Sequence, residues 1–259
     1  IVVDREGALF VVSAGGMHFT NIKKITNDGT IVLEFGERGN EDGQFMFPTG
    51  IALDSHGNIY VVDRNNCDVQ KFDSEGNYIT SWGSCGSTNG KFSAPTDIVV
   101  DANDTIYVAD SGNDRIQKFD DTGFFLGKWG GYGEGDTEFR EPDSLALDAS
   151  GYLFVLDYTN KRIKKFDSDG NFIMAFGTKG SGEGELDYPT SIAIDAQGNI
   201  YVSDTMQEII QKFDSSGNFI TSWGSRGTAN GQFNDPVSVA IDVEGNIYVA
   251  DDYNDSIQK

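Results

Sequence analysis

Five aspartates hold the same place in the chain, each ending a short β-forming run of the type Ile-Tyr-Val-x-Asp. Carboxylates repeated in this way could bind a cation. Aspartate also commonly accepts hydrogen bonds from backbone N–H groups of the turn that follows it. A binding site usually breaks the symmetry of a repeat, whereas structure repeats with it, so we favour the structural role. The five are Asp63, Asp110, Asp157, Asp204 and Asp251.

The chain has two histidines, His18 and His56, in different loops. Metal-dependent and hydrolytic chemistry needs several converging His or carboxylate ligands, or a nucleophile with a His partner. One histidine in each of two distant loops does not supply such a set. We therefore predict no catalytic residues, no metal ligands and no cofactor, and we favour a non-enzymatic role. The acidic chain could still hold a structural cation such as calcium.

The two cysteines, Cys67 and Cys85, flank one predicted hairpin. Counting outward from the tight turn near Gly76 places Cys67 opposite Gly83 or Ser84. Cys85 is then one or two residues away, at the same end of the strands. A disulfide needs Cα atoms about 4.4–6.8 Å apart, and this arrangement allows it. Two free thiols are an equal alternative. A bridge would imply an oxidising compartment.

The elements that position these residues come from a sequence repeat. A motif of the type I-A-L-D-x-x-G-N-I-Y-V-x-D occurs six times, and the prolines and tryptophans keep one phase within it. Residues 50–96 and 191–237 are identical at 27 of 47 aligned positions. The first interval is 50 residues and the next four are 47, as the first aspartates of the motif show: Asp4, Asp54, Asp101, Asp148, Asp195 and Asp242.

Each repeat predicts four short strands, which in the second copy are I-A-L-D, N-I-Y-V-V-D, V-Q-K-F-D and Y-I-T-S-W-G. Glycine marks the turn between the first two strands, except that Asp104 takes its place in the third copy. Both residue types tolerate positive φ, so we predict a left-handed turn residue there. Lysines on the third strand alternate with the buried face, and we expect them to be solvated. They are Lys71, Lys118, Lys165 and Lys212.

The pattern P-x-x-I-A-x-D-x-x-G-N-I-Y-V-x-D, followed by I-Q-K-F-D-x-x-G-N-F and W-G-x-x-G, resembles the NHL repeat over nearly the whole chain. The resemblance implies an all-β, six-bladed β-propeller of four-stranded antiparallel blades. We expect it to form a single domain, residues 1–259. The repeats span about 1–49, 50–96, 97–143, 144–190, 191–237 and 238–259.

The last copy stops inside its third strand, so the last blade is expected to be incomplete. An unpaired strand edge invites pairing with another chain. We expect residues outside this sequence, or a neighbouring molecule, to donate the missing outer strand.

Composition limits the partners. Of 259 residues, 41 are acidic and 19 basic, which gives a net charge of −22. This charge disfavours nucleic acid and anionic membranes. No apolar run approaches the length that spans a bilayer, and no signal peptide is visible.

The loops after the second and fourth strands are expected at the same rim, and they vary most between copies. We therefore predict a non-catalytic binding module, extracellular or at the cell surface, that recognises a protein or a glycan through this rim. The alternative is a metal-dependent propeller lyase or hydrolase, because some NHL-like propellers are lyases. Arg, Tyr and Met are typical interface residues. The candidate binding residues are Arg64, Tyr132, Tyr158, Arg162, Met206 and Tyr253.

Overall fold

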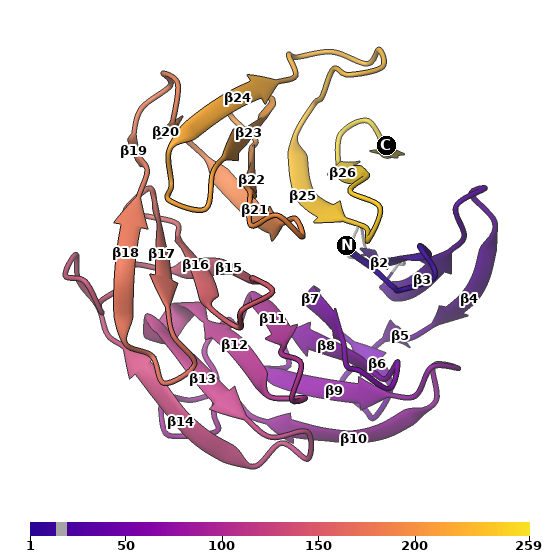
Figure 1. Cartoon of the computed structure of the whole chain (residues 1–259). Coiled ribbons are helices and arrows are strands. Elements are labelled where there is room, and N and C mark those ends of the chain that lie inside the picture. Colours follow the sequence, from indigo (N-terminus) through magenta and orange to yellow (C-terminus); the bar gives the residue numbers. More distant parts are fainter. Residues whose placement is uncertain (14–19) are drawn as a thin grey trace. The chain divides into compact units, whose positions relative to one another are not determined.

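The computed structural model describes residues 1–13 and 20–259, so His18 lies outside the described residues. The chain separates into two compact units, residues 1–132 and 133–259. Each unit contains three antiparallel sheets, one for each repeat (Figure 1). The assignment of residues 1–259 to a single domain stays a prediction.

In the first unit, each sheet is a meander whose strands pair in chain order. The first sheet contains β1 (Val2–Val3), β2 (Leu9–Ser13), β3 (Asn21–Ile25) and β4 (Ile31–Phe35). The second contains β7 (Pro48–Leu53), β8 (Ile59–Asp63), β9 (Asp68–Phe72) and β10 (Tyr78–Gly83). The third contains β11 (Asp97–Val100), β12 (Ile106–Asp110), β13 (Arg115–Phe119) and β14 (Phe125–Gly130). The short parallel pair β5 (Glu37–Arg38) and β6 (Gln44–Phe45) lies between the first and second sheets, and the 3-10 turn η1 (Ser111–Asn113) joins β12 to β13.

In the second unit the same order continues. The fourth sheet contains β15 (Pro142–Leu147), β16 (Leu153–Asp157), β17 (Arg162–Phe166) and β18 (Phe172–Phe176). The parallel pair β19 (Thr178–Lys179) and β20 (Glu185–Leu186) leads to the fifth sheet. That sheet contains β21 (Pro189–Ile194), β22 (Ile200–Asp204), β23 (Ile209–Phe213) and β24 (Phe219–Trp223). The sixth contains β25 (Pro236–Ile241), β26 (Ile247–Asp251) and β27 (Ser256–Gln258).

Neighbouring sheets within a unit cover each other's apolar faces. Every residue of β8, β12, β16 and β22 is buried, so these second strands belong to the protein core. In the first unit, Tyr60 and Val62 of β8 share one core cluster with Val108 of β12. The fourth strands alternate between half-buried and exposed side chains, as outer strands should. Trp82 and Trp129 occupy equivalent places there, as predicted.

The predicted turn conformations are confirmed. Gly57 between the first two strands and Gly76 between the last two have φ of +86° and +81°. Asp104, which replaces glycine in the third repeat, has φ of +59°. Asparagine and aspartate adopt this region at lower cost than other side chains, which explains the single exception.

The expectation that the third-strand lysines are solvated is wrong. Lys71 is 8% exposed, and its Nζ lies 5.0 Å from the ring centre of Tyr60, its cross-strand partner. Lys165 makes an ion pair of 3.0 Å with Asp148. The long lysine stem packs along the neighbouring strand, so only the charged end needs a polar partner. Lys118 and Lys212 are half-buried in the same way.

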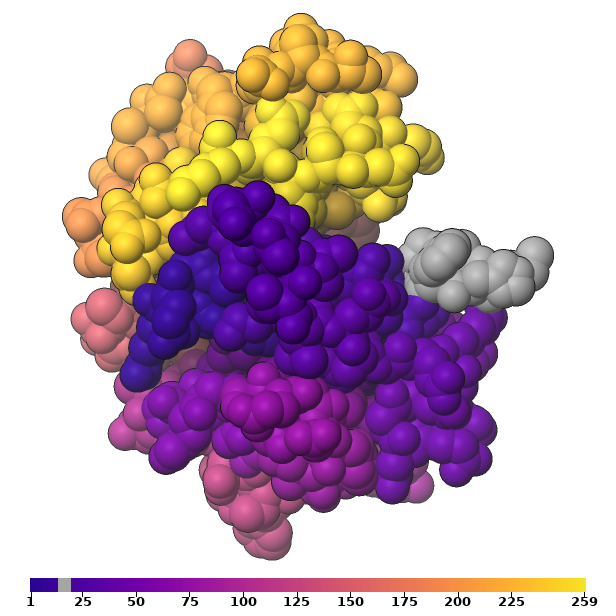
Figure 2. All heavy atoms as spheres, turned by 90° about the vertical axis from the view of Figure 1, so that its right-hand side faces the viewer, coloured from indigo at the N-terminus to yellow at the C-terminus, as the bar shows by residue number. Residues whose placement is uncertain are grey.

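The sixth sheet has three strands in the described structure, and β27 pairs only with β26. In the space-filling view its residues, in yellow, form a continuous surface with the orange residues of the preceding sheet (Figure 2). The donation of a fourth strand stays a prediction. Among the described residues, no helix is long and apolar enough to cross a membrane.

Candidate functional site: the rim loops

The rim loops are the five segments that follow the second strands, residues 64–67, 111–114, 158–161, 205–208 and 252–255. The aspartate before each loop holds it in place. Both oxygens of the buried Asp63 accept hydrogen bonds: Oδ2 from the N–H of Met46 (2.6 Å), and Oδ1 from the N–H groups of Asn65 and Asn66 (2.9 and 3.0 Å). The structural role predicted for this aspartate is therefore confirmed. The same backbone acceptance from the preceding loop recurs at Asp110, Asp157, Asp204 and Asp251.

A second contact, present in four of the five rim loops, fixes the third residue of the loop. The side-chain amide of Asn66 donates to the carbonyl of Gly39 (3.1 Å), and that of Asn113 donates to the carbonyl of Gly86 (3.0 Å). Asn160 and Asn254 repeat the contact in the second unit. Because this position serves the scaffold, the variation between loops falls on the positions around it.

Of the six candidate binding residues, four are exposed to solvent and two, Tyr158 and Arg162, are half-buried. Arg64, Met206 and Tyr253 lie in rim loops and are exposed; Met206 is 65% and Tyr253 72% exposed. Tyr132, in the loop after β14, is also exposed. Tyr158 is half-buried against the ring of Tyr188.

Arg162 is partly committed to the scaffold. Its Nε contacts Asp157 (3.1 Å), and a terminal nitrogen donates to the carbonyl of Glu134 (2.6 Å). Within the second unit, Arg162 lines a small cavity. Tyr158 contacts Lys161, which lines the same cavity. Met206 and Tyr253 do not line this cavity, and Arg64 and Tyr132 belong to the other unit.

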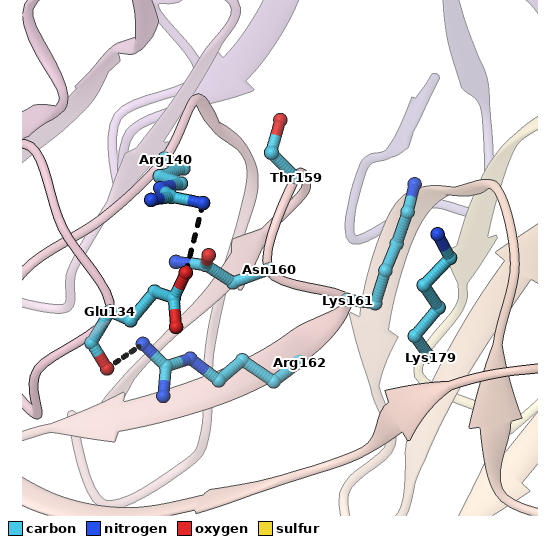
Figure 3. Close-up of a pocket in the computed structure, with 7 residues that line it drawn as sticks. All are labelled: Glu134, Arg140, Thr159, Asn160, Lys161, Arg162 and Lys179. Carbon is cyan, nitrogen blue, oxygen red and sulfur yellow. Dashed lines mark hydrogen bonds and ion pairs between the residues drawn. The ribbon is translucent and has the colours of Figure 1, made fainter.

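This cavity, of about 240 Å³, gathers positive charge on a chain that is strongly negative overall (Figure 3). Arg140 pairs with Glu134 (2.9 Å) beside it. Figure 3 shows Lys161 and Lys179 extending in the same direction. The cavity is lined by Glu134, Arg140, Thr159, Asn160, Lys161, Arg162 and Lys179.

Lys161 lies against two aromatic rings. Its Nζ is 4.1 Å from the ring centre of Tyr158 and 4.9 Å from that of Tyr188. Burial lowers the pKa of Lys161, and the nearby Lys179 lowers it further, while Asp204 and Asp187 act in the opposite direction. Lys161 was not among the predicted binding residues, which are Arg, Tyr and Met. The signal was present in the repeat, because the equivalent residues are Cys67, Asp114, Glu208 and Asp255.

The second sheet carries a disulfide between Cys67 and Cys85, with a Cα–Cα distance of 5.0 Å. This resolves the two alternatives left open by the sequence. The bond joins the rim loop of this sheet to the loop after β10, so these two loops meet at one end of the sheet.

The described residues bring three ionisable side chains together at the opposite end of the strands. Donor atoms of Asp54, His56 and Asp104 all lie within 4.8 Å of one another. The sequence analysis predicted no metal ligands and did not anticipate this group, which forms because the hairpin of the third sheet brings Asp104 beside His56. Asp104 also accepts hydrogen bonds from the N–H and hydroxyl of Ser55, which tie the two hairpins together. These three side chains could bind a divalent cation. However, the carboxylates of Asp54 and Asp104 already accept hydrogen bonds from residues of the turns.

The family of the chain follows from comparison with known proteins. A family model described as a 6-bladed beta-propeller matches residues 50–129 and 136–214, and a model described as the NHL repeat matches residues 233–259. The chain belongs to this six-bladed β-propeller family. Membership confirms the all-β propeller and the NHL resemblance predicted from the repeat.

Two curated relatives match a short part of the chain. Human NHL repeat-containing protein 3 is 30% identical over 70 residues, which is 27% of this chain and 20% of that protein. Protein wech of Drosophila melanogaster is 35% identical over 70 residues, covering 22% of this chain and 8% of that protein. The chain thus spans well under two thirds of either relative.

Solved structures share the fold at low identity. A streptogramin B lyase has a TM-score of 0.65 and 16% identity, over 95% of this chain and 76% of the lyase. A gluconolactonase from Xanthomonas campestris has a TM-score of 0.67 and 14% identity, over 95% and 80% of the two chains. A chain from the nidogen–laminin complex has a TM-score of 0.67 and 17% identity, over 96% and 87%. These propellers serve catalysis and complex formation, so the likeness establishes the fold alone.

Proposed function

We propose that this propeller is a non-catalytic interaction module that recognises a protein or a glycan through the rim loops. The supporting observation is the division of labour within each loop. Aspartate and asparagine hold the backbone by the same contacts in successive repeats, while the exposed positions differ. Variable side chains on a rigid scaffold are the usual basis of a binding surface.

The second unit offers the most apolar rim. Met206 and Tyr253 are the second residues of consecutive rim loops, and both are exposed. The backbone of each loop is also bonded to the loop that precedes its sheet: the N–H of Thr205 donates to the carbonyl of Tyr188, and that of Tyr253 donates to the carbonyl of Asn234. A loop backbone that is already held in place loses little entropy on binding, and Tyr and Met are common interface residues, so this surface is favoured for a partner.

The test uses displayed peptide libraries and a glycan array with the wild-type chain and two variants. Met206→Ala/Tyr253→Ala removes the apolar rim residues. Val243→Ala is the control, because Val243 is an exposed apolar residue in the β25–β26 hairpin, at the other end of the same sheet. We expect ligands that lose binding with the double variant and keep it with the control. Ligands that bind the double variant as tightly as the wild type would contradict the proposal. So would enzymatic turnover of a lactone or a lyase substrate.

We further propose that the module works outside the cell or at its surface. The Cys67–Cys85 bridge supports this, because disulfides persist in oxidising compartments. Alkylation of free thiols in the native source, followed by mass spectrometry of the peptide that carries each cysteine, tests the location. Both cysteines should resist alkylation until the protein is reduced; two alkylated thiols would argue for a reducing compartment.

A further inference from the structure

Two positions of the repeat lie beside each other at the rim. They are the fourth residue of the rim loop and the third residue after the outer-strand Trp or Phe. In the second sheet they are Cys67 and Cys85, which are bonded. In the fourth sheet, 94 residues further on, they are Lys161 and Lys179.

The backbone confirms that these positions correspond. Cys67 and Lys161 both have left-handed φ, +57° and +55°. Cys85 forms a parallel bridge with Phe92, and Lys179 pairs in the same way with Leu186. The two lysines therefore start from backbone sites that are close enough for a disulfide in the second sheet.

The fourth sheet is the exception in charge. In the second, third and fifth sheets these two positions hold a disulfide, an acidic residue with a tyrosine, or an acidic residue with an arginine. In the fourth sheet both side chains are cationic. Nearby like charges repel each other, and Lys179 accordingly lowers the pKa of Lys161. The four pairs are Cys67 with Cys85, Asp114 with Tyr132, Lys161 with Lys179, and Glu208 with Arg226.

Asp204 and Asp187 act on Lys161 electrostatically, but neither forms an ion pair with it. Within the described residues, neither Lys161 nor Lys179 forms an ion pair, although Arg140 beside them is paired with Glu134. The rings near Lys161 attract a cation through their faces but carry no net charge. Lys161 and Lys179 line the same cavity, which has room for a small anionic group.

We propose that the Lys161–Lys179 pair binds a single carboxylate of a protein ligand, supplied by an Asp or Glu side chain or by a chain terminus. This assignment rests on the proposed function and names the chemistry recognised at one part of the rim. A carboxylate between two ammonium groups relieves their repulsion and forms charge-assisted hydrogen bonds. One carboxylate is favoured over a polyanionic glycan, because the net charge of −22 repels extended negative chains.

The fifth sheet supplies a natural template for the variant. Lys161→Glu/Lys179→Arg installs the Glu208–Arg226 pair of that sheet, so the backbone should accept it. Lys128→Glu is the control: Lys128 is an exposed residue of β14, and the substitution changes the net charge by the same two units. The probes are glutamate blocked as N-acetyl methylamide, the matching blocked glutamine, glucuronate and sulfate.

Binding is followed by NMR of the lysine ε-carbons. We expect blocked glutamate to shift the Lys161 and Lys179 signals, and blocked glutamine to leave them in place. Lys161→Glu/Lys179→Arg, called the rim variant here, should bind blocked glutamate about tenfold or more weakly than the wild type. Lys128→Glu should bind it as tightly as the wild type. Equal binding by the rim variant would overturn the proposal. So would tighter binding of glucuronate, which would indicate an acidic glycan, or equal binding of sulfate, which would indicate an unselective anion site.

The two proposals can fail separately. If Met206→Ala/Tyr253→Ala abolishes binding of a rim ligand while Lys161→Glu/Lys179→Arg leaves it intact, the interaction module stands and the carboxylate site falls. If neither variant affects any ligand, the proposed function itself is wrong.

Discussion

Asp63 and Asp68 stand opposite each other across β8 and β9, so that two carboxylates face one another in the second sheet. The third and fourth sheets pair the equivalent aspartate with arginine, as in Asp110 with Arg115. Oδ1 of Asp68 is buried and accepts no hydrogen bond from the described residues. Burial raises the pKa of Asp68 to about 7, and Asp63 and Asp42 contribute to the shift.

This carboxyl should make the protein less stable as pH rises. Between the ordinary pKa of 3.8 and about 7, the folded chain holds a proton that the unfolded chain has lost, so unfolding becomes easier through that range. Asp68→Asn should raise the free energy of unfolding at pH 8 by about 3 kcal/mol, and the gain should shrink towards pH 4. Asp68→Arg, which restores the pairing of the third sheet, should stabilise at pH 8 too. Urea unfolding at several pH values measures both; a gain independent of pH would contradict the assignment.

Reduction should destabilise the second sheet. The Cys67–Cys85 bond closes a loop with a sequence separation of 18, and loops of this size are worth about 3 kcal/mol through the restricted unfolded chain. Thermal unfolding with and without dithiothreitol measures the loss. Cys67→Ser/Cys85→Ser is the control, since its melting temperature should not respond to the reductant. A wild-type chain that melts at the same temperature in both buffers would contradict the expectation.

Gly123 should resist substitution more strongly than its conformation alone requires. It has φ of +84°, and a Cβ built there would lie 2.6 Å from the Trp82 ring of the neighbouring sheet. Gly29 has nearly the same φ, +85°, with no atom within 4 Å of the added Cβ. Gly29→Ala should cost about 1 kcal/mol through backbone strain, and Gly123→Ala about 1–3 kcal/mol more through the clash. Equal losses in chemical unfolding would show that the Trp82 contact is not limiting.

The open edge of β27 should accept a fourth strand. Residues 213–224 follow the same point of the fifth repeat that Lys259 reaches in the sixth, and they include β24. Appending a copy of this segment after Lys259 should raise the melting temperature, because it pairs the free edge and covers apolar surface. A matched extension with Ile220 and Trp223 changed to Asp is the control. If the two extensions behave alike, the edge is not the site of pairing.

Nucleic acid binding is expected to be undetectable at physiological salt. The net charge of −22 opposes the release of counterions that drives such binding. Fluorescence anisotropy with a labelled single-stranded RNA, at two salt concentrations, is a direct measurement. Tight binding that weakens steeply with salt would show that a local basic surface binds RNA despite the negative net charge of the chain.

The fold could be predicted from the sequence because the repeat fixes each element several times over. The left-handed residue between the first two strands was identified through the substitution of Asp104 for glycine, and the structure confirms its φ. The pairing around Gly76 placed Cys67 and Cys85 at one end of the sheet, although the bond itself remained open. Such features depend only on residues that are close together in the sequence, so they can be predicted without knowing how the sheets pack.

Contacts between repeats were harder to predict. The group around His56 was not predicted, because Asp104 is 48 residues away and only the packing of two sheets brings them together. The lysine pair escaped notice for a related reason: each residue is ordinary, and the departure appears only when Lys161 and Lys179 are compared with Glu208 and Arg226. The candidate binding residues were chosen by residue type. The cavity, in contrast, contains Lys161 and Lys179, a pair whose combined charge differs from that of the equivalent pairs in the second, third and fifth repeats.

The Cys67–Cys85 bond also determines what a protease would leave behind. The hairpin at residues 73–77 is an exposed turn, the kind of segment where cleavage usually begins. A cut there would fall between the two cysteines, so both fragments would stay covalently joined and β9 could remain paired with β10. Such a nicked molecule would migrate as one species until a reductant separated it. Damage at the hairpin would thus stay hidden, and the rim loop that begins at Arg64 would keep its place.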